Sequence, residues 1–346
     1  MKETIKIIDI VYGTVNIEDN MLFDLINSKA FKRLEQISQQ GVPATFLPKA
    51  TTTYSRYEHS IGVMVILRKL GASSEEQAAG LLHDVSHTAF SHVIDYVIGD
   101  GTKEDYQDSI HKDFFHNDSE LSQILQLHSL DPKRVSNLEI HGLLERPQPE
   151  MCADRFDYTM RYYAHNGDKA FVKRCVDSIT MRDNVMVFSS LDPAREFAER
   201  HLATWNATSG GYAEKGGDIA VRLYLFSSAL KIALSKNLIT IEDFKQTDGY
   251  VMDRLVKAGD VRIDKILKIL SNNIEFTLSE SNPKIELRSK FRYVDPLFLS
   301  GDSTKRVSNA DADFGRLMND AIKMNRNGNK LKIGSIKGIE IPINLT

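Results

Sequence analysis

Between residues 56 and 95, this chain places ionisable side chains inside segments whose other positions are largely apolar. At the centre lies the adjacent pair His83 and Asp84, which follows the apolar residues Leu81 and Leu82. Burying such groups without partners costs roughly several kcal/mol each. Any fold of this chain must therefore supply partners for them, such as a metal ion or a charged ligand.

The pattern predicts a metal site made of two imidazoles and two carboxylates. His83 and Asp84 can offer a nitrogen and an oxygen to one ion, and His59 and Asp154 are their expected partners. A single His on a helix is more often a surface or core residue than a ligand, so the prediction rests on the combination. Such a mixed set suits a divalent ion, namely Mn, Fe, Ni, Co, Zn or Mg, rather than a soft metal.

Hydrophobic periodicity predicts a mainly α chain. Helices are expected over 19–39, 57–70, 73–83, 106–116, 121–127, 151–163, 192–205, 218–236 and 260–273. A small hairpin is expected over 5–17, and strands over 184–190, over 284–293, around Ile333 and over 339–343. A Gly-rich turn at 209–217 is expected to join two long helices. We predict a helical core over 1–180 and a mixed α/β accessory region over 181–346.

The amino-acid composition excludes several classes of protein. The 346 residues are 42% hydrophobic and 26% charged, as in a soluble globular protein. The net charge of −3 gives no strong nucleic-acid signal and argues against a membrane-surface protein. Two cysteines are too few for a disulfide framework, and neither a signal peptide nor a membrane span is expected. We therefore expect a cytoplasmic protein.

Four segments resemble the HD-domain dNTP triphosphohydrolases. Residues 31–37 (FKRLEQI) are similar to that family's F-x-R-L-x-x-I segment, and residues 56–62 (RYEHSIG) to its R-[FY]-E-H-S-[LI]-G segment. Residues 82–92 (LHDVSHTAFSH) resemble the segment with the HD pair, and residues 154–158 (DRFDY) resemble D-[KR]-x-D-Y. The resemblance covers residues 8–165 and implies an HD-domain helical bundle.

The resemblance also implies a role for each matching residue. The metal ligands would be His59, His83, Asp84 and Asp154. The catalytic residues would be His87, Asp95 and His111, and the substrate-binding residues Gln39, Arg56, His92, Arg155 and Tyr158. The implied chemistry is attack of a metal-polarised water at the α-phosphorus of a nucleotide, releasing a nucleoside and triphosphate. Arg161 shares a helix face with Tyr158 and is expected to extend the phosphate-facing edge or to lie in solvent.

The catalytic His departs from the family's pattern. The family places it in an H-E segment and pairs it with the carboxylate that matches Asp95. The best match here is His111, but Lys112 stands where the Glu belongs. A second alignment puts Gln107 and Asp108 there instead and leaves no catalytic His.

The sugar contacts depart as well, which leaves the substrate open. Gln40 is polar where members that exclude a 2′-hydroxyl often have an apolar residue, and Tyr162 replaces an Asp that reaches the 3′-hydroxyl. Three hypotheses remain: a (deoxy)nucleoside triphosphate triphosphohydrolase, a metal-dependent phosphomonoesterase or phosphodiesterase, and a non-catalytic nucleotide-binding regulator. The intact ligand set argues against the third. The C-terminal half is large enough to form an interface between copies, so a homo-oligomer stays open.

Overall fold

The computed structural model describes residues 4–48, 53–205, 213–325 and 328–344. The chain is mainly helical, as predicted. Its α-helices are α1 (Asn20–Asn27), α2 (Lys29–Arg33), α3 (Arg56–Lys69), α4 (Ser74–Leu82), α5 (Val93–Val97), α6 (Tyr106–Asn117), α7 (Ser119–Leu127), α8 (Pro132–Val135), α9 (Ala153–His165), α10 (Lys169–Ser178), α11 (Leu191–Trp205), α12 (Ala213–Ser235), α13 (Asp248–Lys257), α14 (Val261–Leu270), α15 (Val307–Ala310) and α16 (Ala312–Met324).

The strands form small sheets at the margins of the helical body. They are β1 (Ile5–Asp9), β2 (Gly13–Ile17), β3 (Ile179–Arg182), β4 (Val185–Phe188), β5 (Phe276–Leu278), β6 (Ile285–Ser289), β7 (Leu297–Ser300), β8 (Ser303–Arg306) and β9 (Asn329–Ile336). The strands β1 and β2 make the predicted hairpin. The other sheets have the orders β3-β4-β7-β8 and β5-β9-β6. The fold therefore combines a helical bundle, an N-terminal hairpin and a mixed C-terminal part, as predicted.

The single helix predicted over 19–39 is wrong, because the chain turns at Ser28. Ser28 is extended (ψ 151°), so α1 stops before it and α2 starts after it. Its hydroxyl donates to the carbonyl of Leu25 at 2.7 Å and accepts from the backbone N–H of Phe31 at 3.4 Å. One serine thus caps the end of one helix and the beginning of the next, which hydrophobic spacing alone does not reveal.

The strand predicted over 339–343 is also wrong. Only an isolated bridge joins Ile339 to Ile336, across a turn in which Gly338 has φ +81°. The strand β9 already pairs with β5 on one side and β6 on the other, so it has no free edge. Pro342 also lacks an N–H for a ladder. Up to residue 212, the predicted Gly-rich turn lies outside the described residues. From 213 to 217 the prediction is wrong, because α12 begins at Ala213 and includes Gly216 and Gly217.

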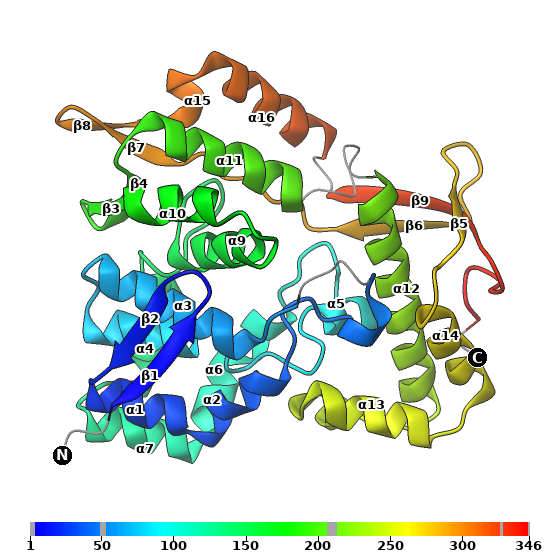
Figure 1. Ribbon diagram of the computed structural model, residues 1–346. Coiled ribbons are helices and arrows are strands. Elements are labelled where there is room, and N and C mark those ends of the chain that lie inside the picture. Colours follow the sequence, from blue (N-terminus) through cyan, green and yellow to red (C-terminus); the bar gives the residue numbers. More distant parts are fainter. Residues whose placement is uncertain (1–3, 49–52, 206–212, 326–327, 345–346) are drawn as a thin grey trace.

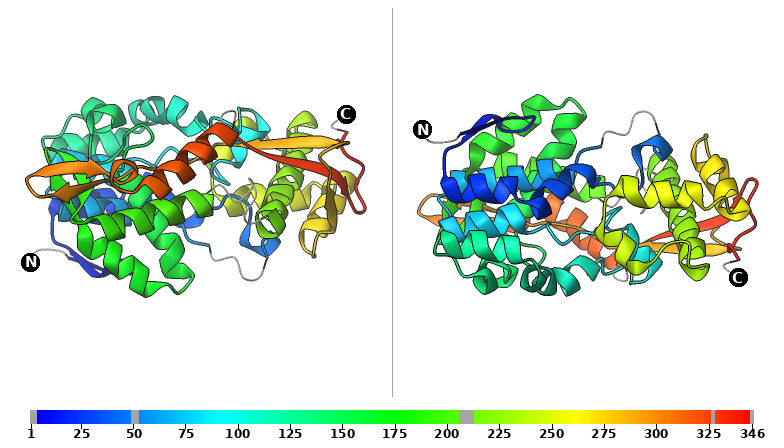
Figure 2. Two further views of the ribbon diagram at one scale, coloured as in Figure 1. Left: turned by 90° about the horizontal axis from the view of Figure 1, so that it is seen from above. Right: turned by 90° about the horizontal axis from the view of Figure 1, so that it is seen from below.

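Two hydrophobic cores hold these elements together. One buries Leu82 and Phe156 with Phe298, and the other buries Phe90 with Phe226. Figures 1 and 2 show the corresponding grouping: the hairpin and the first helices lie at one end, and α12–α14 with the sheet β5-β9-β6 lie at the other. Because both cores include residues from each side of position 180, the domain boundary there remains a proposal that rests on the sequence.

The helix α3 lies where the functional segments meet. A capping box begins it: Ser55 accepts from the N–H of Glu58, whose carboxylate accepts from the N–H of Ser55 at 2.8 Å. The helix packs against α4 and α9. At Gly62 the approach to α9 is so close that a methyl group would lie 1.9 Å from Oδ1 of Asp157. A glycine is needed at position 62, because the buried carboxylate of Asp157 occupies the space that a side chain would fill.

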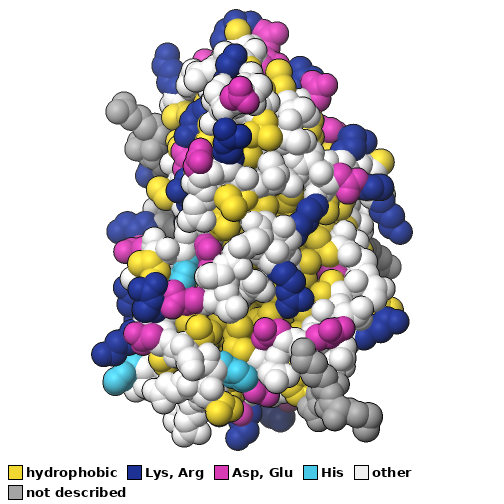
Figure 3. All heavy atoms as spheres, turned by 90° about the vertical axis from the view of Figure 1, so that its left-hand side faces the viewer, with side chains coloured by type: hydrophobic (Ala, Val, Ile, Leu, Met, Phe, Trp, Pro, Cys, Tyr) yellow, Lys and Arg dark blue, Asp and Glu magenta, His cyan; other side chains and the backbone are white. Residues whose placement is uncertain are grey.

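The surface carries both signs of charge. On the face shown in Figure 3, basic and acidic side chains are interspersed, and neither sign gathers into one patch. Within the described part of the chain, none of the helices combines the length and the hydropathy that crossing a bilayer requires.

We predict that Gly62→Ala destabilises the protein by about 2 kcal/mol or more, because the new methyl group displaces the buried Asp157 and overpacks the α3–α9 contact. Chemical denaturation measures the change. The matched control is Gly249→Ala, since nothing lies within 4 Å of a Cβ at that exposed helical position. Equal stability of the two variants would contradict the close approach.

Candidate metal centre

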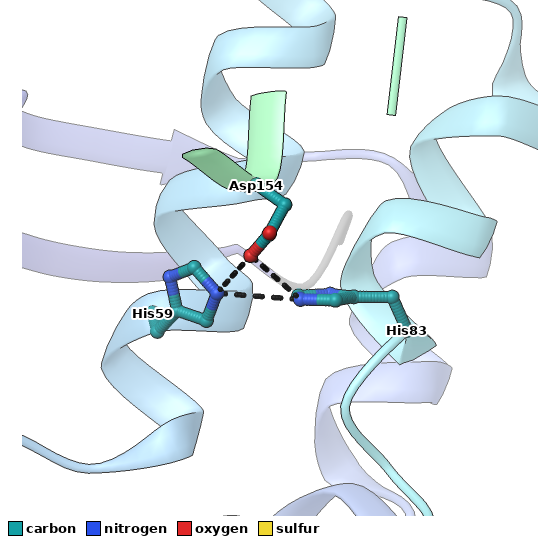
Figure 4. A group of neighbouring side chains, drawn as sticks. All are labelled: His59, His83 and Asp154. Carbon is teal, nitrogen blue, oxygen red and sulfur yellow. Dashed lines mark hydrogen bonds and ion pairs between the residues drawn. The ribbon is translucent and has the colours of Figure 1, made fainter. Parts of the chain in front are cut away.

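Three side chains from separate helices converge on one point. His59 comes from α3, His83 follows the end of α4, and Asp154 lies in the first turn of α9 (Figure 4). The Nε2 atom of His59 lies 3.3 Å from Nε2 of His83 and 3.0 Å from Oδ1 of Asp154. The Nε2 atom of His83 lies 3.6 Å from the same oxygen. Three of the four predicted ligands therefore come together.

The other nitrogen of each imidazole fixes its orientation. Nδ1 of His59 lies 2.8 Å from Oδ2 of Asp157, and Nδ1 of His83 lies 2.8 Å from the carbonyl oxygen of Gly80. Both partners are acceptors, so each Nδ1 carries the proton and donates it. When a ring is neutral, it therefore turns the lone pair of Nε2 inward. Two lone pairs that face each other repel unless a cation or a proton lies between them.

Asp84, the fourth predicted ligand, lies at the edge of this group. Its Oδ1 lies 3.4 Å from Nε2 of His83, and its Oδ2 lies 3.8 Å from Nε2 of His59. Arg56 donates from Nη1 to Oδ2 of Asp84 at 2.8 Å. The side chain of Asp84 is 5% exposed. Asp84 thus joins the histidines to a buried arginine.

The site favours positive charge. Burial alone lowers the pKa of His59, but hydrogen bonds to Asp154 and Asp157 outweigh it and raise this pKa to about 9. Burial alone raises the pKa of Asp154, but the two histidines hold it well below its usual range. The two inward lone pairs and the two carboxylates therefore fit a divalent metal ion. Its holders would be His59, His83, Asp84 and Asp154.

Comparison with known proteins identifies the family. Residues 56–159 match the HD domain. The chain is 34% identical to the uncharacterized protein YdhJ of Bacillus subtilis, over 95% of this chain and 99% of that protein. It is 32% identical to the metal-dependent phosphohydrolase cns2 of Cordyceps militaris, over 81% of this chain and 75% of cns2. The chain belongs to the HD-domain metal-dependent phosphohydrolases.

More distant similarities agree with this assignment. The phosphohydrolase is 24% identical to a deoxynucleoside triphosphate triphosphohydrolase SAMHD1 homolog of Dictyostelium discoideum, over 88% of this chain and 63% of the homolog. Its fold is similar to the crystal structure of a phosphohydrolase from Bacteroides thetaiotaomicron, with a TM-score of 0.60 and 20% identity over 89% of this chain and 95% of that chain. The structural similarity concerns the fold alone.

In this phosphohydrolase, Asp95 pairs with His92. Nδ1 of His92 lies 3.2 Å from Oδ2 of Asp95, whose Oδ1 accepts from the N–H of Tyr106 at 2.9 Å. The side chain of His92 is 33% exposed, and that of Asp95 is 1% exposed. A buried carboxylate therefore orients a histidine that solvent can reach.

The expected pairing of Asp95 with His111 is wrong. His111 is buried. Its Nδ1 lies 2.8 Å from Oγ of Ser86, and its ring packs against Phe115. Gln107, the alternative of the second alignment, donates to the carbonyl of His83 at 2.9 Å. Gln107 thus supports the backbone at His83, and His111 pairs with the side chain of Ser86 and lacks the carboxylate on which its catalytic assignment rested.

Two buried polar atoms beside the metal cluster have no hydrogen-bond partner among the described residues. They are Nη2 of Arg56 and Nδ1 of His87. His87 lies 3.3 Å from Asp84 through Nε2, and its ring meets that of His92 edge-on at 4.9 Å. Leaving such atoms unpaired costs roughly 1–3 kcal/mol each. The structure therefore brings Arg56, His87 and His92 together with unused hydrogen-bonding capacity beside the metal cluster.

The remaining predicted substrate residues lie in different surroundings. Gln39 donates its backbone N–H to Tyr54 at 2.9 Å, and its buried Oε1 has no partner among the described residues. The ring of Tyr158 lies 6.5 Å from that of His59. Arg155 donates to Glu145 at 3.1 Å and to the carbonyl of Glu150 at 3.3 Å. Its guanidinium is therefore engaged with the protein rather than unpaired.

Arg155 also contacts a second group of side chains that could hold a metal ion. Glu145, Cys152 and Asp154 lie close enough to hold an ion. However, Nη1 of Arg155 lies 3.1 Å from Sγ of Cys152, and Nη2 lies 3.1 Å from Oε1 of Glu145. A guanidinium thus already contacts two of these three side chains, which favours the His59–His83 group as the metal centre.

Sequence reasoning missed the ion network behind His59. Asp157, whose Oδ2 accepts from His59, also accepts from Nε of Arg161 at 3.0 Å. Arg161 donates from Nη2 to Oδ2 of Asp9 in the hairpin at 2.9 Å. Arg161 is fully buried, so both expectations for it, a phosphate-facing edge and a solvated face, are wrong. Asp157 follows Asp154 by three positions, a spacing that signals a shared helix face, whereas nothing in the sequence singles out Asp9.

We predict that His111 makes the phosphohydrolase sensitive to acid. Burial lowers the pKa of His111 to about 4, so the folded state keeps it neutral while the unfolded chain protonates near 6.5. Stability is therefore full above pH 6.5 and is lost as the pH falls towards 4, by at most about 3 kcal/mol. The variant His111→Gln should lose less stability over this interval. Parallel pH dependences of the two proteins in denaturation experiments would contradict a buried neutral His111.

Proposed function

We propose that this phosphohydrolase hydrolyses nucleotides, with a (deoxy)nucleoside triphosphate as the leading substrate and inorganic triphosphate as the product. The observation that carries the proposal is the unpaired hydrogen-bonding capacity of Arg56 and His87 beside the metal cluster. A phosphate group offers several strong acceptor oxygens, and a guanidinium matches their geometry. A phosphate bound there would accept from Nη2 of Arg56, and its negative charge would favour a protonated His87 that donates from Nδ1.

We propose the following division of labour. His59, His83, Asp84 and Asp154 hold the ion, which lowers the pKa of water and offsets charge on the phosphate when it is bound. Arg56 and His87 hold phosphate oxygens. His92, oriented by Asp95 through Nδ1, keeps Nε2 for the substrate and protonates the leaving oxygen. Its partial exposure and its carboxylate partner support this role for His92 rather than His111.

The triphosphate assignment rests on the sequence. The four motifs resemble those of dNTP triphosphohydrolases, and the Dictyostelium relative carries that name at 24% identity. Gln40 and Tyr162 favour a second candidate, a phosphomonoesterase or phosphodiesterase, because they replace the family's contacts to deoxyribose. The buried Oε1 of Gln40, which has no partner among the described residues, supports a hydrogen bond to a substrate hydroxyl.

We also propose a cytoplasmic location. Cys152 and Cys175 are both buried and free, which suits a reducing compartment. Association of copies through the C-terminal half remains a prediction.

A matrix of metals against nucleotides tests the proposal. We expect triphosphate release from at least one nucleoside triphosphate with Mn, Fe, Ni, Co, Zn or Mg, and no turnover by a His83→Ala/Asp84→Ala control. Chromatography identifies the phosphate product. Release of inorganic phosphate from monophosphates, with triphosphates inert, would favour the second candidate. Nucleotide binding without turnover would leave only the regulator.

We predict that Arg56→Gln lowers kcat/KM by about 10- to 100-fold, since a charged hydrogen bond is worth about 1.5–3 kcal/mol. Steady-state kinetics on the substrate found by the matrix measure the loss. The matched control is Lys69→Gln, which removes the same charge from the exposed far end of α3. Equal losses in both variants would contradict a specific phosphate contact at Arg56.

A further inference from the structure

The loop between α4 and α5 includes His87 and leads to His92, the two histidines proposed to contact the substrate. Part of its backbone has an unfavourable conformation. Phe90 and Ser91 have φ values of +63° and +49°, in the left-handed region that residues other than glycine rarely adopt. The loop keeps this conformation only if surrounding groups hold it. Its ends are fixed by Asp84 at the metal cluster and by Asp95 in α5.

The C-terminal region supplies the groups that hold the loop. Oδ1 of Asp248 accepts from the N–H of Phe90 at 2.7 Å, and the carbonyl of Phe244 accepts from the N–H of Ala89 at 2.7 Å. The ring of Phe90 packs edge-on against Phe226 of α12 at 4.8 Å. These partners come from segments more than 100 residues further along the chain.

Asp248 holds a second segment with its other oxygen. Oδ2 accepts from the N–H of Ser38 at 2.9 Å. The carbonyl of Ser38 in turn accepts from Oγ of Ser91 at 2.6 Å, and Oγ of Ser91 accepts from Nε of Arg56 at 3.0 Å. One carboxylate thus joins two segments that meet at the proposed phosphate-binding arginine.

A carboxylate in the first turn of a helix often serves only the helix dipole. In α13, however, the capping hydrogen bond is made by Thr247, whose side chain accepts from the N–H of Tyr250. Both oxygens of Asp248 accept from distant N–H groups instead. The helix therefore presents Asp248 to the loop.

We propose that Asp248 is a positioning residue that holds residues 87–92 and Arg56 in the arrangement that binds phosphate. The inference rests on the proposed function, since it assigns Asp248 to the same site. It makes the helices α12 and α13 part of the active site. The two histidines of the metal centre stand apart, because they are oriented by Asp157 and by the carbonyl of Gly80, which Asp248 does not contact.

The test compares Asp248→Ala with Thr247→Ala. Both changes weaken the beginning of α13, but only the first removes the acceptor of the Phe90 and Ser38 N–H groups. Calorimetry measures the affinity for Mn²⁺ alone, and then for inorganic triphosphate on the Mn²⁺-loaded protein. Hydrogen exchange of the segment 85–92 reports the loop directly.

We expect Asp248→Ala to keep its Mn²⁺ affinity, to bind triphosphate about tenfold more weakly or worse, and to exchange faster in the segment 85–92. Thr247→Ala should match the wild type in all three measurements. Asp248→Asn keeps one acceptor oxygen and should give an intermediate effect, which preserves the test if Asp248→Ala does not fold.

Two results would overturn the inference alone: equal triphosphate affinity in Asp248→Ala and Thr247→Ala, or a parallel loss of Mn²⁺ affinity in Asp248→Ala. A wild-type protein that binds Mn²⁺ but not triphosphate would instead overturn the proposed function, and the inference with it. The wild-type titration therefore separates the two failures.

Discussion

Two imidazole nitrogens that face each other 3.3 Å apart set the constraint on which this structure depends. The arrangement is unfavourable without a positive charge between them. It persists because each ring is fixed from behind, His59 by Asp157 and His83 by the carbonyl of Gly80. The fold thus commits three helices to a site that a cation stabilises.

The hydrogen bonds that orient the metal centre continue beyond the residues in contact with its ligands. The network runs from His59 through Asp157 and Arg161 to Asp9, so the N-terminal hairpin is tied to the metal centre by buried ion pairs. Removing one partner from such a network leaves an uncompensated buried charge. Gly62 belongs to the same arrangement, because its missing side chain makes room for Asp157. Stability and function therefore draw on the same residues.

The sequence was sufficient for the parts of the fold that repeat a local pattern. The helices α3, α4 and α9 follow from hydrophobic spacing, and the convergence of His59, His83 and Asp154 from the resemblance of their motifs to those of the family. Ser28 and the neighbourhood of Ile339 were misjudged, because a cap and the absence of a free sheet edge depend on contacts outside the local periodicity. The partner of Asp95 was misjudged because His111 was chosen from the family resemblance, although it lies 16 positions after Asp95, whereas His92 lies three positions before it.

The residues that hold the site from a distance were not predictable. Asp248 lies 158 positions from Phe90, and Asp9 lies 152 positions from Arg161. Neither belongs to a motif, and each is an ordinary acidic residue in its local sequence. Their roles follow from tertiary structure, because a buried hydrogen bond across the fold leaves no trace in local periodicity.

Anomalous diffraction from crystals of the Mn²⁺-loaded protein tests the central claim most directly. We expect a strong peak at bonding distance, about 2.0–2.3 Å, from Nε2 of His59, Nε2 of His83 and a carboxylate oxygen of Asp154, with Asp84 beside it. A peak between Glu145 and Cys152, or a metal-loaded crystal without a peak between the two histidines, would contradict the account.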